Sequence, residues 1–153
     1  MGESDKAKWE VDKIMSGIVR EYTEENYLTE NKNHLINLSN HPSSAWSGEQ
    51  LAAAYEFGDV IDMPFPQVRA DADEEMIRRM AEDAVERILG NNPSAVLVQG
   101  EFTLTYRIVA TLLEKGVKVL AACSERRTKE WTEPDGTTVK TVNFSFVRFR
   151  EYR

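Results

Sequence analysis

The sequence predicts an α/β protein: a Rossmann-like three-layer sandwich with a mainly parallel sheet and a C-terminal antiparallel hairpin. Between residues 34 and 122, four short apolar runs alternate with segments of helical periodicity, which is typical of parallel strands joined by crossover helices. The turn sequence EPDG at 133–136 then separates two β-like runs, 129–132 and 138–149, and predicts the hairpin at a sheet edge.

The four predicted strands lie at 34–38, 60–63, 95–98 and 117–122. The third, AVLV, is apolar at every position, as expected for a central parallel strand that helices cover on both faces. If the strand order is 2-1-3-4, as in flavodoxin-like sheets, strands one and three flank the point where the order reverses.

Three helices connect these strands. The first begins at the capping-box sequence SGEQ (47–50) and is expected to end at Gly58. Its inward positions are Leu51, Ala54 and Tyr55.

The second helix lies within DADEEMIRRMAEDAVERILGNNP (71–93). Acidic residues in its first turn and Arg87 in its last complement the helix dipole, and Gly90 follows its end. The third helix spans 103–115 and ends at Gly116. In the hairpin, the apolar residues change parity after Phe146, which predicts a β-bulge or a twist near that residue.

Residues 1–32 are predicted to form an N-terminal helical extension and linker ahead of a domain at 33–153. Apolar residues at helical spacing give 6–22 one apolar face, which either packs on its own domain or joins two subunits. This face, together with Phe144, Phe146 and Phe149, is more apolar surface than a small sheet covers, and it predicts a homodimer.

Composition excludes several classes of function. A net charge of −7 argues against a surface that coats long nucleic acid, although one basic pocket could still hold a small anion. The single cysteine and two histidines predict no disulfide, no metal site and no cofactor. No apolar stretch reaches 18 residues and the first thirty residues are too charged for a signal peptide, so we expect a cytoplasmic protein without a membrane partner.

Polar residues cluster where three predicted strands end. These segments are NLSNHPSSAW (37–46), QGEFTLTY (99–106) and CSERR (123–127). Ligands of open α/β sheets bind outside the carboxyl ends of the strands, so the three segments predict the walls of one crevice.

The residues of the first segment have chemical uses and structural alternatives. His41 could act as a general base or bind a phosphate, or it could be an ordinary loop residue. Ser43 and Ser44 could be nucleophiles only with a positioned base, and no GxSxG motif surrounds them. Trp46 could stack on a base or pack on the following helix.

The other two segments suggest an anion site. Gly100 would let a ligand approach the backbone at a helix N-terminus, where Thr103 either caps the helix or contacts the ligand. Glu101 could bind ribose hydroxyls or a base amino group, or its negative charge could argue against a phosphate ligand at this position. Arg126 and Arg127 could bind a phosphate or be solvated charges.

At these strand ends the chain resembles the small CRISPR-associated, CARF-like Rossmann-like proteins: sensors of cyclic oligoadenylate messengers and stand-alone ring nucleases. The likeness lies in NLSNHPSSAW, VLVQGEFTLTY and VKVLAACSERR, over roughly residues 34–127. The resemblance implies a role in antiviral defence, a homodimer that binds its ligand across the interface, and metal-independent cleavage through attack by a ribose 2′-hydroxyl.

The resemblance also implies site residues. On one side of a nucleotide pocket it implies Asn40, His41 and Ser43, with Ser44 beside them and His41 and Ser43 as catalytic candidates. The implied floor and opposite side are Gln99, Gly100, Thr103, Thr105, Ser124, Arg126 and Arg127, with Glu101 at the same strand end.

The sequence therefore supports a nucleotide-messenger binder that could also be a ring nuclease. The alternative is a non-catalytic protein-interaction module whose strand-end loops merely cap the fold. A small-molecule enzyme using Cys123 or Ser43 is a third hypothesis, and it is the weakest of the three because the sequence shows no constellation of bases for either nucleophile.

Overall fold

The computed structural model of the protein describes residues 34–153, and they confirm the predicted α/β class. The predicted helix at 6–22 and its linker lie outside these residues. The elements in chain order are β1 (His34–Ser39), η1 (Ser43–Ala45), α2 (Gly48–Tyr55), β2 (Asp59–Pro64), α3 (Glu74–Leu89), β3 (Ala95–Val98), α4 (Phe102–Glu114), β4 (Val119–Thr132) and β5 (Thr138–Glu151).

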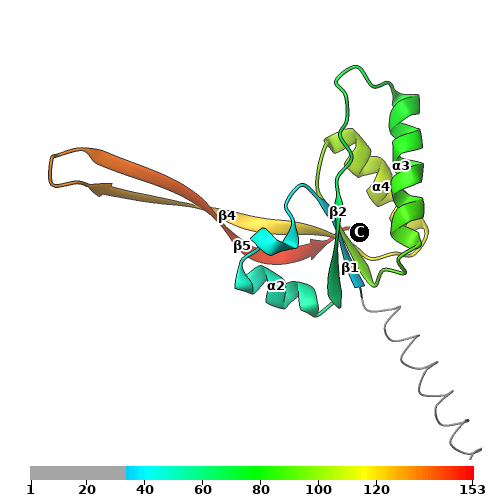
Figure 1. The fold of residues 1–153 in the computed structure, drawn as a ribbon, viewed down its shortest axis with the longest axis horizontal. Coiled ribbons are helices and arrows are strands. Elements are labelled where there is room, and N and C mark those ends of the chain that lie inside the picture. Colours follow the sequence, from blue (N-terminus) through cyan, green and yellow to red (C-terminus); the bar gives the residue numbers. More distant parts are fainter. Residues whose placement is uncertain (1–33) are drawn as a thin grey trace, which may run out of the picture.

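The five strands form one sheet in the order β2-β1-β3-β4-β5. The first four are parallel and β5 is antiparallel to β4, so the sheet has the flavodoxin-like 2-1-3-4 order on which the expectation of a shared crevice depends. Helix α2 covers one face, and α3 and α4 cover the other (Figure 1).

Alternation along the strands builds the two halves of the core. On β1, Ile36 and Leu38 pack against α3 and α4, whereas Leu35 packs on the α2 side. Strand β3 is buried at all four positions, as its apolar run predicts. Asp73 caps the N-terminus of helix α3, and its carboxylate accepts a hydrogen bond from the N–H of Met76 at 2.8 Å.

Helix α2 corrects one sequence-based prediction. Ser47 caps it as predicted, and Ala54 is fully buried. Tyr55, however, was expected to point inward and is 59% exposed. The helix ends at Tyr55, three residues before Gly58, so its short inner face reaches the sheet mainly through Ala54.

The largest correction concerns the fourth strand, which was predicted to end at residue 122. Strand β4 runs on to Thr132, because its backbone stays paired with β5 out to the Thr132–Thr138 pair. It pairs with β3 only at Val119 and Leu120. Beyond that point the two strands form a ribbon that projects from the sandwich (Figure 1), and we call residues 124–146 the β arm.

The predicted irregularity near residue 146 is confirmed. Cys123 pairs with Arg148 and Ser124 with Phe146, which leaves Val147 as the extra residue of a β-bulge. The bulge lets both Phe146 and Phe149 pack in the core on the α2 side, with their ring centroids 5.0 Å apart. These two rings therefore do not supply the exposed apolar surface expected of them, whereas Phe144 is 74% exposed.

Candidate strand-end pocket

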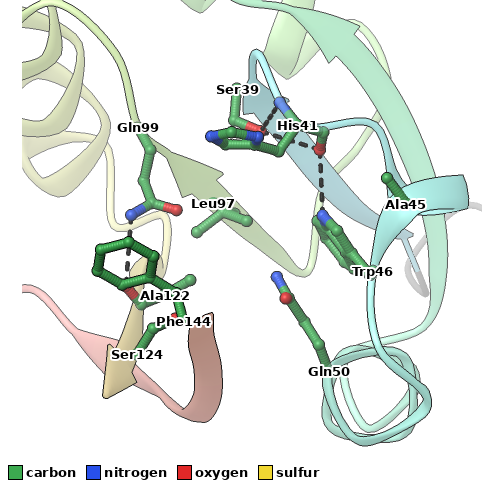
Figure 2. Close-up of a pocket in the computed structure, with 10 residues that line it drawn as sticks. All are labelled: Ser39, His41, Ala45, Trp46, Gln50, Leu97, Gln99, Ala122, Ser124 and Phe144. Atoms are coloured by element: carbon green, nitrogen blue, oxygen red, sulfur yellow. Dashed lines mark hydrogen bonds between the residues drawn. The ribbon is translucent and has the colours of Figure 1, made fainter. Parts of the chain in front are cut away.

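A pocket of about 370 Å³ opens at the carboxyl ends of the central strands, on the α2 side of the sheet. Strands β1, β3 and β4 form its floor, while the segment from η1 to α2 and the β arm form opposite walls (Figure 2). The lining residues are Ser39, His41, Ala45, Trp46, Gln50, Leu97, Gln99, Ala122, Ser124 and Phe144. The pocket thus lies where the reversal of strand order predicts it.

A buried asparagine holds the first wall in place. Asn37 is 1% exposed, and its Nδ2 donates to the carbonyl oxygen of His41 at 2.9 Å and to Asp62 Oδ1 at 2.8 Å. The hydroxyl of Ser39 donates to Asn37 Oδ1 at 2.7 Å. The His41 carbonyl also accepts from Trp46 Nε1 at 3.0 Å. Because one carbonyl joins the strand, the turn and the indole, the backbone of His41 and the Trp46 ring are fixed together.

Asp62 in β2 secures the turn that follows β1. Its carboxylate accepts from the backbone N–H of Ser43 at 3.1 Å and from the Ser43 hydroxyl at 2.8 Å. Burial alone would raise the pKa of Asp62, but the hydrogen bonds from Asn37 and Ser43 outweigh it, so the pKa lies below its ordinary value.

Three of the site residues that the resemblance implies line the pocket, namely His41, Gln99 and Ser124, and so does Trp46, which the sequence suggested as a stacking residue. Asn40, Ser43 and Ser44 lie in the turn beside it but do not line it. The Ser43 hydroxyl is directed at Asp62 and fixes the turn.

The start of α4 differs from the predicted anion site. Glu101 is the N-cap: its carboxylate accepts from the backbone N–H of Leu104 at 2.8 Å and from that of Thr103 at 3.1 Å. The N–H of Leu104, then the hydroxyl and N–H of Thr103, lower the pKa of Glu101. Thr103 is therefore not the cap, and a carboxylate occupies the place that a phosphate would take.

Gly100 and Thr105, which were also proposed as ligand contacts, are surrounded by the protein's own packing. A Cβ on Gly100 would come within 2.4 Å of the Phe65 ring. The glycine therefore lets the backbone approach this ring of the protein itself. The hydroxyl oxygen of Thr105 is buried in the first turn of α4.

The two arginines of CSERR lie in strand β4, not in a strand-end loop, and on opposite faces of the β arm. Arg126 pairs across the ribbon with Phe144, so both side chains lie on the face of the β arm that forms the pocket wall. Arg127 pairs with Asn143 on the other face, and its guanidinium lies 3.6 Å from Glu125. Only Arg126 is on the side of the pocket.

Sequence reasoning missed Asn37, Asp62, Gln50 and the pocket role of Phe144. Asn37 carried a usable signal, because an amide inside an apolar strand needs hydrogen-bond partners. Phe144 carried none, since its place in the pocket depends on the pairing of β4 with β5 far along the chain.

The lining chemistry suits a flat, uncharged group. Trp46 and Phe144 stand on opposite walls, and the amides of Gln50 and Gln99 also line the pocket (Figure 2). Among the described residues, none that lines the pocket is an aspartate, glutamate, lysine or arginine, and His41 is the one titratable group. Within 34–153, no cluster of three or more His, Cys, Asp or Glu side chains could hold a metal ion.

A second depression of about 400 Å³ lies between the starts of α3 and α4. Thr103 lines it, as do the exposed rings of Phe102 and Tyr106, which are 89% and 74% exposed. No helix in the described part of the chain is both long and apolar enough to cross a membrane.

The fold and the pocket define a Rossmann-like α/β protein with a strand-end pocket and a projecting β arm. Residues 33–150 match the family described as the Uncharacterized protein MJ1673 family, and the chain belongs to that family. Comparison with curated proteins gave no significant match.

Proposed function

We propose that the protein binds a nucleotide messenger of the cyclic oligoadenylate class, with one nucleobase held in the strand-end pocket. The observation that carries the proposal is an uncharged pocket with aromatic walls and amide groups at the reversal of strand order. Aromatic rings stack on nucleobases, and amides hydrogen-bond to their edges. The resemblance of the strand ends to cyclic oligoadenylate sensors supports the same ligand class.

The size of the pocket sets how the ligand is held. A volume of about 370 Å³ is near the lower end of the roughly 300–1,000 Å³ typical of small-molecule sites. It takes one nucleoside-sized unit, so the rest of a cyclic oligonucleotide lies outside, along the β arm. Arg126 is the cation on that face of the β arm next to the pocket and serves as the phosphate partner.

Cleavage of the ligand is the second part of the proposal. The ribose 2′-oxygen bonds to the adjacent phosphorus, and the bond from phosphorus to the next 5′-oxygen breaks, leaving a 2′,3′-cyclic phosphate. His41 takes the 2′-hydroxyl proton and returns it to the departing 5′-oxygen. Because the ligand supplies the nucleophile and His41 the base, activity should persist in EDTA.

The wider proposal is of a cytoplasmic, CRISPR-associated homodimer that acts in antiviral defence. The resemblance of the strand ends supports this assignment, and the pocket chemistry agrees with the ligand it requires. Phe144, Trp131 and Val142 on the β arm, which are 74%, 44% and 39% exposed, are apolar side chains that a second subunit could cover.

Binding can be tested by thermal shift and by quenching of tryptophan fluorescence, with cyclic tetra- and hexa-adenylate as the probes. We expect the cyclic ligands to raise the melting temperature. Phe144→Ser should weaken binding roughly tenfold, within the range for loss of one stacking partner. Phe102→Ser is the matched control, because Phe102 is also a largely exposed phenylalanine but lies in the second depression.

The competing function is a protein-interaction module, and the exposed pair Phe102 and Tyr106 favours it. These rings lie four residues apart on α4, where one partner could contact both. If no nucleotide or cyclic oligonucleotide shifts the melting temperature, the binding proposal fails and this alternative stands.

A further inference from the structure

The side chain of Gln99 has a defined orientation at the pocket floor. Its backbone N–H donates to the carbonyl oxygen of Leu38 at 3.1 Å, which fixes the residue at the end of β3. Its Nε2 donates to the carbonyl oxygen of Ala122 at 3.3 Å. The reversed amide would set Oε1 against that carbonyl, and two acceptors repel each other.

This orientation determines what Gln99 offers to a ligand. With Nε2 turned to Ala122, Oε1 lies on the side of the pocket that faces His41 and Trp46 (Figure 2). A carbonyl oxygen only accepts hydrogen bonds. On the side that faces His41 and Trp46, Gln99 thus presents an acceptor, Oε1, to the ligand.

We infer that Gln99 is a specificity-determining residue that selects bases with an exocyclic amino group over their oxo counterparts. The inference rests on the proposed function, because it requires a nucleobase in this pocket. An amino group, such as the 6-amino group of adenine or the 4-amino group of cytosine, donates to Oε1. The corresponding oxo group of hypoxanthine or uracil places a second acceptor at that position, so Oε1 loses the hydrogen bond that the amino group makes.

The expected discrimination follows from the cost of that unpaired acceptor. A site built to hydrogen-bond a ligand group rejects an analogue that lacks the group, because its own polar atom loses both water and partner. One such bond at a partly open pocket corresponds to roughly tenfold in dissociation constant.

The test compares matched pairs of mononucleotides on the full chain by titration of tryptophan fluorescence. Wild type should bind AMP about tenfold more tightly than IMP, and CMP about tenfold more tightly than UMP. Gln99→Met keeps the size of the side chain but removes the acceptor, so both preferences should fall toward one. Gln67→Met is the matched control, because Gln67 is an exposed glutamine outside the pocket lining.

The outcomes separate this inference from the proposed function. Equal binding of AMP and IMP by wild type overturns the role of Gln99 while nucleotide binding stands. A preference that persists in Gln99→Met also overturns it. If neither the mononucleotides nor the cyclic oligoadenylates bind, the proposed function itself fails. The two wild-type comparisons need no variant, so the inference can be refuted even if Gln99→Met does not fold.

Discussion

Substitution of Gly100 by alanine tests whether this glycine serves packing or ligand approach. The new Cβ would lie 2.4 Å from Cδ1 of Phe65 and 2.5 Å from two further ring atoms. Phe65 is only 4% exposed and belongs to the core cluster shared with α3 and α4. The ring cannot swing into solvent, so the contact must be relieved by movement of the core or of the backbone.

The magnitude follows from two opposing effects. Overpacking of a well-packed core costs about 1–3 kcal/mol, whereas replacing glycine by alanine lowers the entropy of the unfolded chain and returns about 0.4–1 kcal/mol. We expect a net loss of about 1–2 kcal/mol in the free energy of unfolding. For a domain of this size that corresponds to a fall of roughly 4–8 °C in melting temperature.

Thermal and urea unfolding without ligand provide the assay. Gly48→Ala is the matched control, because a Cβ at Gly48 meets nothing within 4 Å, and it should leave stability equal or slightly higher. The double variant Gly100→Ala with Phe65→Leu should show that the two single losses are not additive, because the smaller side chain removes the clash. A Gly100→Ala protein as stable as wild type, or strictly additive losses, would refute the packing argument.

Two further predictions concern charged groups. Arg126→Ala should weaken binding of a cyclic oligoadenylate roughly tenfold, the lower end expected for a charge-assisted hydrogen bond at an exposed site, and more than His41→Ala does. Arg127→Ala should have little effect, because Arg127 lies on the other face of the β arm. Binding titrations at low and high salt check this, and equal losses of affinity in Arg126→Ala and Arg127→Ala would contradict it. The pKa of Asp62 is lowered on folding, so its contribution to stability is present above the unfolded value near 3.8 and is lost as pH falls below it. Urea unfolding should therefore show that Asp62→Asn is less stable than wild type at pH 6 and that this difference shrinks by pH 3; a difference that stays constant between the two pH values would contradict this role of Asp62.

The parallel core could be predicted because burial on both faces leaves a direct record in the sequence. The run at 95–98 is apolar at every position, and the observed strand has the same bounds. The far part of β4 left no such record. Ser124, Arg126 and Thr128 are held in a strand by the backbone ladder with β5, which needs no apolar side chains, so the segment resembled a polar loop.

The position of the candidate pocket could be predicted from the sequence, but its lining residues could be predicted only in part. Reversal of strand order is a property of topology, and it correctly placed the pocket beside the ends of β1 and β3. The residues that shape the pocket depend on contacts between distant parts of the chain. Asp62 reaches Asn37 only because β2 pairs with β1, and Phe144 forms a wall only because the bulge sets the register of the β arm.

The distribution of charge around the pocket also bears on how an acidic chain would hold an anionic ligand. The net charge of −7 creates a field that repels a phosphate at long range. The pocket lining carries no carboxylate, and the β arm balances four basic against four acidic side chains, so this repulsion is not concentrated at the pocket. Glu101 faces the amides of α4, which offset its charge. Affinity would then come mainly from stacking and amide contacts to the base, with Arg126 supplying the phosphate contact. Such a site favours a ligand that places one base in the pocket of each subunit of the proposed dimer over a ligand recognised by its phosphates alone.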